Sequence, residues 1–207
     1  TLDILKCILL TATEKGLIVT ATDLELGIQS APITAAIEET GSIALEAHLF
    51  TEIIRKVNGT EVFIQTNEKN ETSISCGFSD FKIVGQNGED FPTLPKVEKK
   101  QEYKMLQSNL KNMIRQTIFS IAQEESKPIL TGELLEFKQN QIQMVSVDGY
   151  RISFRKEEVS ENNREIQVVV PGKTLSEINK ILSNEERVVL LYTTDKHILF
   201  DIDGNIV

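Results

Sequence analysis

Few side chains in this sequence combine the type and the spacing that catalysis or metal binding requires. The two histidines, His48 and His197, lie outside any His-Glu-x-x-His pattern, and Cys7 and Cys76 lack the Cys-x-x-Cys spacing of zinc and redox sites. Glycine-rich phosphate-binding motifs and the Gly-x-Ser-x-Gly turn of serine hydrolases do not occur in the sequence. We therefore expect no catalytic residue, no metal site and no cofactor, and two cysteines that pack as small buried hydrophobic side chains.

One pair of carboxylates could still perform acid–base or metal chemistry. Asp23 and Asp148 occupy equivalent positions of an internal repeat, and paired carboxylates can hold a divalent metal for hydrolysis. The alternative is that each aspartate ends a strand and opens a turn, as the pair Asp148-Gly149 between two β-rich segments indicates. We favour the turn, and a metal-dependent hydrolase that uses Asp23 and Asp148 is the less favoured alternative.

Basic residues gather on the expected helices. Residues 48–58, 108–122 and 172–183 carry six Lys or Arg and two Glu, a net charge of +4, so the rest of a chain with a net charge of −9 sums to −13. The six basic residues are Arg55, Lys56, Lys111, Arg115, Lys173 and Lys180. This segregation is typical of a surface that follows a phosphate backbone without reading the base sequence. Solvated helix faces are also rich in Lys and Arg, and the sequence alone favours that simpler interpretation.

The helices and turns belong to a tandem repeat with a constant offset of 125 residues. The register carries hydrophobic segments, turns and a helix from one copy to the other without a gap, and it carries Arg55 onto Lys180. The matched segments are residues 3–10 with 128–135, 17–23 with 142–148, and 43–45 with 168–170. On this alignment we expect the chain to open inside the first copy and to stop inside the second.

Hydrophobic periodicity predicts an α+β fold for each copy. We expect short strands in antiparallel sheets, with the helices on one face and Ser108 as the N-cap of the second helix. Alternation predicts a half-buried strand at residues 24–29 that includes Leu24, and a strand at 73–79 whose inward side chains include Phe78. The other expected strands span residues 17–22, 62–66, 81–85, 103–106, 134–137, 142–147, 152–155, 166–170, 188–192 and 198–202.

Composition indicates a folded chain with two domains. The 207 residues are 40% hydrophobic and 26% charged, which leaves enough apolar surface for packed cores. Pro92 and Pro95 favour a linker at residues 91–101, between a first domain at 1–95 and a second at 102–207. The longest apolar runs are far shorter than the roughly 20 residues of a membrane span, and we read no leader segment, so we expect a cytoplasmic protein.

Four segments carry a resemblance to a known family: Thr22–Glu25, Asp90–Pro92, Val147–Arg151 and Val168–Ile181. They resemble the bacterial DNA polymerase III beta subunit family of replicative sliding clamps. The resemblance runs through the whole chain and implies tandem clamp domains, with most of the family's first and second domains present and the third absent. Members of this family are non-catalytic homodimeric rings with helices around the hole and sheets outside, and they hold a polymerase on duplex DNA by encircling it.

The resemblance assigns the basic helix residues to the DNA-facing side. It also identifies residues 123–129 as a DNA-contacting loop, in which Lys127 is the candidate contact. The loop is more acidic here than we would expect, since Glu124 and Glu125 precede the lysine. The resemblance thereby explains an acidic body combined with cationic helices, because such a protein slides on DNA without adhering to it elsewhere.

A second implied site is a hydrophobic pocket that takes short linear peptides from the polymerase III alpha subunit, the clamp loader and repair proteins. The part of the pocket in this chain would consist of Leu130, Val147, Gly149, Tyr150, Arg151 and Ile152. A turn that exposes an aromatic residue beside apolar side chains, with an arginine at the rim, suits peptide binding. An ordinary tight turn explains the same residues, and a peptide-binding module without any role on DNA is the alternative function.

Overall fold

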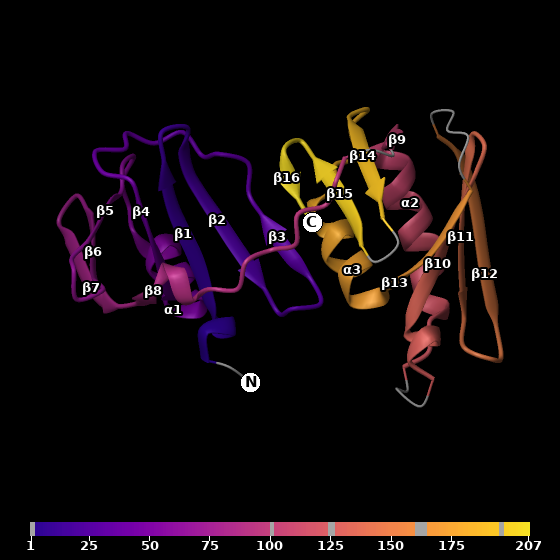
Figure 1. The fold of residues 1–207 in the computed structure, drawn as a ribbon, viewed down its shortest axis with the longest axis horizontal. Coiled ribbons are helices and arrows are strands. Elements are labelled where there is room, and N and C mark those ends of the chain that lie inside the picture. The colour runs from indigo at the N-terminus through magenta and orange to yellow at the C-terminus, as the bar shows by residue number, and fades with distance from the viewer. Residues whose placement is uncertain (1–2, 100–101, 124–126, 160–164, 195–196) are drawn as a thin grey trace. The chain divides into compact units, whose positions relative to one another are not determined.

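The computed structural model describes residues 3–99, 102–123, 127–159, 165–194 and 197–207 (Figure 1). The chain divides into two compact units, Thr1–Pro95 and Lys96–Val207, which we call unit 1 and unit 2. Each unit combines antiparallel strands with helices, so the α+β class predicted from the sequence is confirmed. Among the described residues, the helices are too short or too polar to cross a membrane.

Unit 1 contains two groups of antiparallel strands and one long helix. The strands pair in the orders β8-β4-β1-β2-β3 and β5-β6-β7. The strands are β1 (Cys7–Thr13), β2 (Gly16–Thr22), β3 (Gly27–Gln29), β4 (Gly41–Glu46), β5 (Phe63–Thr66), β6 (Glu71–Cys76), β7 (Ser79–Val84) and β8 (Gln86–Asn87). Helix α1 (Ala47–Lys56) follows β4 directly, and its Ile53 is buried with Leu45 of β4 and Ile74 of β6. The helix therefore covers one face of both strand groups.

Unit 2 has the same plan, and two of its helices belong to its core. Its strands pair in the orders β12-β11-β10-β13 and β9-β14-β15-β16. The strands are β9 (Glu102–Leu106), β10 (Gly132–Lys138), β11 (Gln141–Val147), β12 (Ile152–Glu158), β13 (Ile166–Pro171), β14 (Val188–Thr193), β15 (Ile198–Ile202) and β16 (Asn205–Ile206). Helices α2 (Gln107–Thr117) and α3 (Gly172–Ile181) lie between the two sheets of the unit (Figure 1). Leu110 of α2 and Leu175 of α3 are wholly buried with Phe137 and Leu191 from the two sheets.

The repeat register predicted from the sequence is confirmed element by element. At an offset of 125 residues, both bounds coincide for β1 and β10, for β2 and β11, for β4 and β13, and for α1 and α3. The same holds for the short 3-10 helices η1 (Asp3–Lys6) and η4 (Pro128–Thr131). The positions 125 residues before strand β9 and helix α2 lie ahead of Thr1, so these two elements are outside the part of the repeat that can be compared.

The half-buried strand predicted at residues 24–29 is wrong in its first half. Only Gly27–Gln29 form strand β3, and Leu24 is 65% exposed with a φ of 78°. The cause is Asp23, whose side chain accepts backbone N–H groups and folds the chain into a turn before the strand begins. The alternation of apolar residues therefore continues through a segment that is not extended.

The inward position predicted for Phe78 is also wrong. Cys76 pairs with Ser79, so Gly77 and Phe78 form a two-residue hairpin turn between β6 and β7, and Phe78 is fully exposed. Gly77 supplies the positive φ of 59° that such a turn requires. Strand β6 thus ends three residues earlier than its hydrophobic pattern indicates.

All three helices end earlier than predicted, and α1 and α2 each begin one residue earlier. Helix α2 starts at Gln107 with Leu106 in the N-cap position, and Leu106 offers no side-chain hydrogen bond, so Ser108 lies in the first turn and is not the cap. Gln107 is wholly buried and its backbone N–H donates to the carbonyl of Arg187 at 2.7 Å. Because this contact satisfies an N-terminal donor, the strand-to-helix transition does not depend on a polar cap. The helix ends at Thr117 and continues as the 3-10 segment η3 (Ile118–Ser120).

The connection between the units is shorter than residues 91–101. Phe91 is buried and packs with Cys7 and Ala44, so it belongs to the core of unit 1. Lys99 forms an ion pair with Asp201 at 2.9 Å and lies over the ring of Tyr192, so it is held by unit 2. Residues 100–101 lie outside the described part of the chain.

Candidate nucleic-acid and partner-binding surfaces

The two aspartates that could hold a metal are both used in turns. The Oδ1 atom of Asp23 accepts the backbone N–H groups two and three residues further on, at 3.1 and 2.8 Å. Asp148 does the same at 3.0 and 3.1 Å, and the N–H of Tyr150 is the main cause that lowers the pKa of its carboxyl group. Within the described residues, His, Cys, Asp and Glu do not gather in groups of three that could bind a metal. The geometry favours the turn over the hydrolase.

The cysteines are buried as expected. Cys7 and Cys76 are both free thiols with at most 6% of their surface exposed. Burial is the main cause that raises the pKa of the Cys7 thiol. Because a raised pKa lowers the fraction of reactive thiolate, Cys7 is suited to packing rather than to chemistry.

The basic residues of α1 lie in its last turn. Arg55 and Lys56 are both exposed, and Lys56 forms an ion pair with Glu52 at 3.0 Å one turn earlier. The helix dipole favours cations at this end, so the sequence places them where they also stabilise the helix. Arg55 and Lys56 are therefore positioned on an accessible surface of unit 1.

Helix α3 presents its basic residues in the same way. Lys173 in the first turn and Lys180 in the last turn are exposed, and Lys180 contacts Glu177 at 2.8 Å. Lys180 and Arg55 are equivalent in the repeat, and both lie in the last turn of their helices. The two units thus carry an exposed cation at the same structural position.

Lys111 on α2 has a different environment from the other basic helix residues. Its Nζ donates to the carbonyl oxygen of Leu182, just after α3, at 2.6 Å. Gln107, one turn earlier on α2, accepts the N–H of Ser183 at 3.0 Å and donates to the carbonyl of Val188 at 3.3 Å. Lys111 is consequently half-buried and tethers α2 to the segment that follows α3, whereas Arg115 on the same helix is exposed. This tether was not predicted from the sequence.

Lys127 is exposed at the start of η4. Its backbone carbonyl accepts the N–H of Leu130 at 2.9 Å, which fixes the chain leaving the expected DNA-contacting loop. Residues 124–126 of that loop, which include the two acidic residues, lie outside the described part of the chain.

Five of the six residues expected in the peptide pocket come from one hairpin turn. Val147 ends β11 and pairs with Ile152 at the start of β12, and Gly149 in the turn between them has a φ of 96°. Tyr150 is fully exposed and Ile152 is 71% exposed, while Val147 is half-buried. The sixth, Leu130, is half-buried in η4. The turn therefore offers a tyrosine and an isoleucine to solvent without a covering element among the described residues of unit 2.

Arg151 of this turn is held in place rather than extended. Its Nε donates to Oδ2 of Asp148 at 2.8 Å, and its guanidinium carbon lies 6.0 Å from the ring centroid of Phe119. The Arg151 side chain remains 56% exposed. Phe119 belongs to η3 and is 57% exposed, and sequence reasoning did not include it in the site. The sequence carries no signal for Phe119, because its exposure and its contact with Arg151 are properties of the folded chain.

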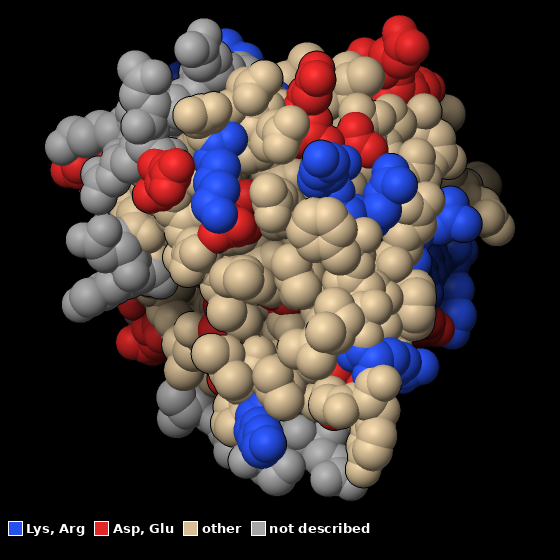
Figure 2. Space-filling view, turned by 90° about the vertical axis from the view of Figure 1, so that its right-hand side faces the viewer, with Lys and Arg blue, Asp and Glu red and all other residues tan. Residues whose placement is uncertain are grey.

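Part of the outward face of the sheet β12-β11-β10-β13 is also apolar. Strand pairing aligns Val169, Leu134, Val145 and Phe154 in one row across the four strands. Phe154 is 52% exposed and Val169 is 37% exposed. Figure 2 shows the side of the molecule where these strands lie, with an uncharged area in the middle and both basic and acidic residues around it. The exposed turn thus continues into an apolar sheet face.

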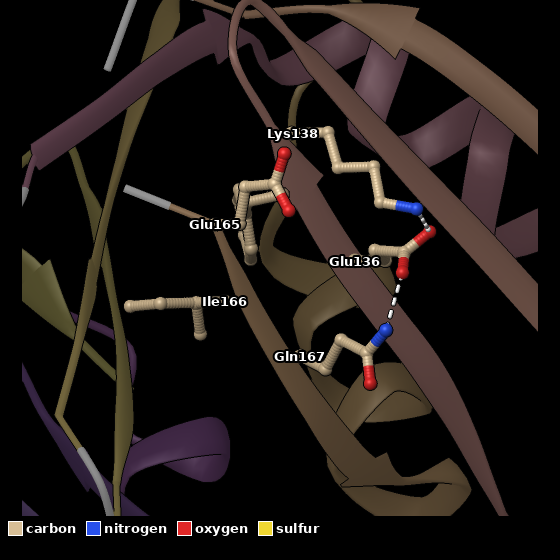
Figure 3. A pocket seen from close by; sticks show the side chains of 6 residues that line it. Glu136, Lys138, Glu165, Ile166 and Gln167 are labelled. Carbon is tan, nitrogen blue, oxygen red and sulfur yellow. Dashed lines mark hydrogen bonds and ion pairs between the residues drawn. The ribbon is translucent and has the colours of Figure 1, made fainter. Parts of the chain in front are cut away.

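A shallow polar hollow lies elsewhere on β10 and β13 (Figure 3). Glu136 accepts hydrogen bonds from Lys138 at 2.9 Å and from the Gln167 side chain, and the bond from Lys138 is the main cause that lowers the pKa of Glu136. Phe137, Glu165 and Ile166 complete the lining. Because these polar groups pair with one another, the hollow has the character of an ordinary solvated surface.

Glu133 is a buried carboxyl group that the sequence did not single out. It lies on the inner face of β10 with no exposed surface, and burial raises its pKa to about 7, an effect that the hydroxyl of Thr117 partly opposes. Ser146 on the adjacent strand donates to the backbone carbonyl of Thr117. In unit 1 the equivalent positions of Glu133 and Ser146 are Ile8 and Ala21. The second copy therefore contains a polar cluster under the end of α2 that the first copy lacks.

Two family models match the chain. Residues 1–95 match the DNA polymerase III beta subunit, N-terminal domain, and residues 104–207 match the DNA polymerase III beta subunit, central domain. The beta sliding clamp of Staphylococcus aureus (strain Mu50) is 35% identical over 216 residues, which cover all of this chain and 56% of that protein. The chain thus spans little more than half the length of the curated relatives it matches.

Solved structures show the same similarity. A putative DNA polymerase III beta subunit from Eubacterium rectale matches the whole chain with a TM-score of 0.95 and 42% identity, and 56% of that protein is covered. A sliding clamp from Pseudomonas aeruginosa, solved bound to griselimycin, matches the whole chain with a TM-score of 0.90 and 26% identity, again over 56% of its length. These matches extend through both units.

Proposed function

Because the chain belongs to the DNA polymerase III beta subunit family, we propose that it supplies two consecutive domains of a sliding clamp, a processivity factor that encircles duplex DNA and tethers the replicative polymerase. Residues 1–95 are its first domain and 102–207 its second, in a longer protein that closes as a homodimeric ring. The observation that carries the proposal is the family match over both units, together with a repeat that places an exposed cation at the end of α1 and of α3. The tandem clamp fold itself is shown by the structural matches.

In this proposal the cationic helix residues face the DNA. Arg55, Lys56, Arg115, Lys173 and Lys180 make transient, sequence-independent contacts with phosphates, and Lys127 contributes from η4. Lys111 supports the DNA-facing surface mainly by its hydrogen bond to Leu182, which joins α2 to the segment after α3. The acidic remainder of the chain discourages adhesion to DNA elsewhere, so retention comes from topology rather than from tight binding.

The exposed turn between β11 and β12 is the second half of the proposal. Tyr150, Arg151 and Ile152, with Gly149, Val147 and Leu130, contribute one side of a pocket for short linear peptides of the polymerase III alpha subunit, the clamp loader and repair proteins. Its support is an exposed aromatic beside apolar side chains and a restrained arginine. The relative bound to griselimycin shows that a protein of this fold takes a ligand.

The protein acts as a non-catalytic accessory subunit in the cytoplasm. Both carboxylates that a hydrolase would need are occupied with turn N–H groups, which leaves that alternative without structural support. A peptide-binding module without a role on DNA uses the same turn, so the experiment must separate the two functions.

The decisive experiment measures retention of the intact protein on circular DNA. A clamp stays on a closed circle after loading and is lost when the circle is cut once. Charge reversal of Arg55 and Arg115 is expected to impair loading or retention while peptide binding persists, and reversal of Lys82 and Lys138 on exposed strand positions is the matched control. Equal retention on cut and closed circles would contradict the clamp, and an unchanged DNA phenotype after reversal would favour the peptide-binding module.

A further inference from the structure

The Arg151 side chain lies between two groups from different elements. Asp148 in the same turn accepts from its Nε at 2.8 Å, and the ring of Phe119 on η3 lies 6.0 Å from its guanidinium carbon. The next residue of η3, Ser120, shares a hydrogen bond of 2.6 Å with Ser153 of β12, two residues after Arg151. The position of Phe119 relative to the turn is therefore fixed by a hydrogen bond that does not involve Arg151.

The repeat supplies an internal comparison for this turn. In unit 1 the same backbone turn forms around Asp23, with Leu24 at a φ of 78° where unit 2 has Gly149 at 96°. At the position of Arg151 unit 1 has Leu26, and at the position of Tyr150 it has Glu25. Since the turn closes with either set of side chains, the fold does not require Arg151, Tyr150 or the contact with Phe119.

We propose that Phe119 is a positioning residue of the partner-binding surface. Phe119 holds the Arg151 guanidinium against Asp148, so that the remaining N–H groups of the guanidinium are preorganised for a carbonyl or carboxylate oxygen of the bound segment. This inference rests on the proposed peptide-binding function of the turn. Nε–H is already donated to Asp148, and a guanidinium has further donors in a fixed plane, which suits planar oxygen acceptors. The surface therefore selects a segment that places such an oxygen beside an apolar side chain.

A double-mutant cycle on the intact protein tests this role, with griselimycin as the probe and calorimetry as the measurement. A cation–aromatic contact at an exposed site corresponds to about a two- to fivefold change in affinity, so Phe119→Ala is expected to weaken binding by that factor. In an Arg151→Ala background the same substitution is expected to have no effect, because Phe119 acts through the arginine. Phe63→Ala, which removes an exposed phenylalanine of unit 1, is the matched control.

Each outcome has a distinct meaning. Loss of the Phe119 effect in the Arg151→Ala background supports the inference, and so does a change in the NMR shift of the Arg151 side-chain protons in Phe119→Leu without ligand. If Phe119→Ala weakens griselimycin binding equally in both backgrounds, or does not weaken it at all, the inference is overturned. The proposed peptide pocket is unaffected by either result. Failure of the unsubstituted protein to bind griselimycin counts against the pocket itself, and the inference falls with it.

Discussion

At the scale of single residues, the repeat separates what a turn needs from what a binding surface needs. Asp23 and Asp148 make the same pair of hydrogen bonds to backbone N–H groups, so the aspartate is the part of the turn that the fold uses twice. The side chains that follow differ completely between the copies. In this turn, the aspartate that both copies share is explained by folding, and the side chains that differ between the copies are open to function.

We predict that Asp23→Ala and Asp148→Ala destabilise their own units to a similar extent. Each substitution leaves two turn N–H groups without their acceptor, which is expected to lower the melting temperature of the affected unit by a few degrees. Asp148→Asn keeps an acceptor oxygen, so the melting temperature of unit 2 is expected to fall less than in Asp148→Ala, although the substitution removes the ion pair with Arg151. Differential scanning calorimetry of the three variants makes the comparison, and an unchanged Asp23→Ala melting profile would contradict it.

A second residue-scale prediction concerns the pH dependence of unit 2. The pKa of Glu133 is about 7 in the folded protein against 4.5 for an exposed glutamate, so folding favours the protonated carboxyl group. Its stabilising contribution is complete below pH 4.5 and is lost as the pH rises to 7, by about 3 kcal/mol at roughly 1.4 kcal/mol per unit of pKa. Glu133→Gln is therefore expected to stabilise unit 2 at pH 8 and to leave its stability at pH 4.5 nearly unchanged.

Urea unfolding of unit 2 at the two pH values measures this difference. Glu136→Gln is the control on the same strand, because the Lys138 contact lowers the pKa of Glu136 and its substitution is expected to act in the opposite direction. Equal stabilities of the Glu133→Gln variant and the unsubstituted protein at pH 8 would show that the buried carboxyl has a compensating partner.

At the scale of secondary-structure elements, the tether between α2 and the end of α3 yields a testable difference between two cations. Lys111→Met removes a hydrogen bond to the Leu182 carbonyl and is expected to destabilise unit 2 by about 1–2 kcal/mol. Arg115→Met on the exposed face of the same helix is expected to change stability by less than about 0.5 kcal/mol. Denaturant unfolding of the two variants distinguishes these roles, and equal effects would contradict the tether.

The secondary-structure elements also show why part of the fold was predictable from the sequence and part was not. The repeat predicted helices and strands in the right register, since hydrophobic periodicity and offset are properties of the chain itself. Leu24 and Phe78 were misplaced because an aspartate turn and a tight hairpin turn interrupt segments whose apolar alternation continues unbroken. Local turn chemistry overrides periodicity at these points.

The candidate surfaces were predictable to a different degree. The exposed tyrosine and arginine lie in a turn that the sequence marks by Asp148-Gly149, and the basic helix residues are visible as a charge pattern. The roles of Lys111 and Phe119 depend on contacts between segments 71 and 32 residues apart, and one sequence contains no signal for such pairs. Tertiary contacts of this kind decide whether a charged residue is a tether or a binding group.

At the scale of the whole molecule, the separation of charge sets how the intact clamp should respond to salt. The 207 residues carry a net charge of −9, which repels DNA at long range, so in the proposed clamp their contacts with DNA come from the few cations on the helices. Each phosphate contact that is removed should reduce the slope of log K against log salt by about 0.9. For weak, transient contacts this slope is a more direct measure than the affinity at one salt concentration.

We therefore predict that removing the repeat-equivalent pair, by Arg55→Ala with Lys180→Ala, lowers that slope by about 2 in the intact protein. Lys82→Ala with Lys138→Ala removes the same charge from exposed strand positions and is expected to change the slope little, because those residues lie on β7 and β10 rather than on the helices. Binding to short linear duplexes across a salt series gives both slopes. Equal slopes for the two double variants would mean that net charge alone governs DNA contact. The helices would then have no special part in it, and the repeat would explain the fold of the chain but not its function.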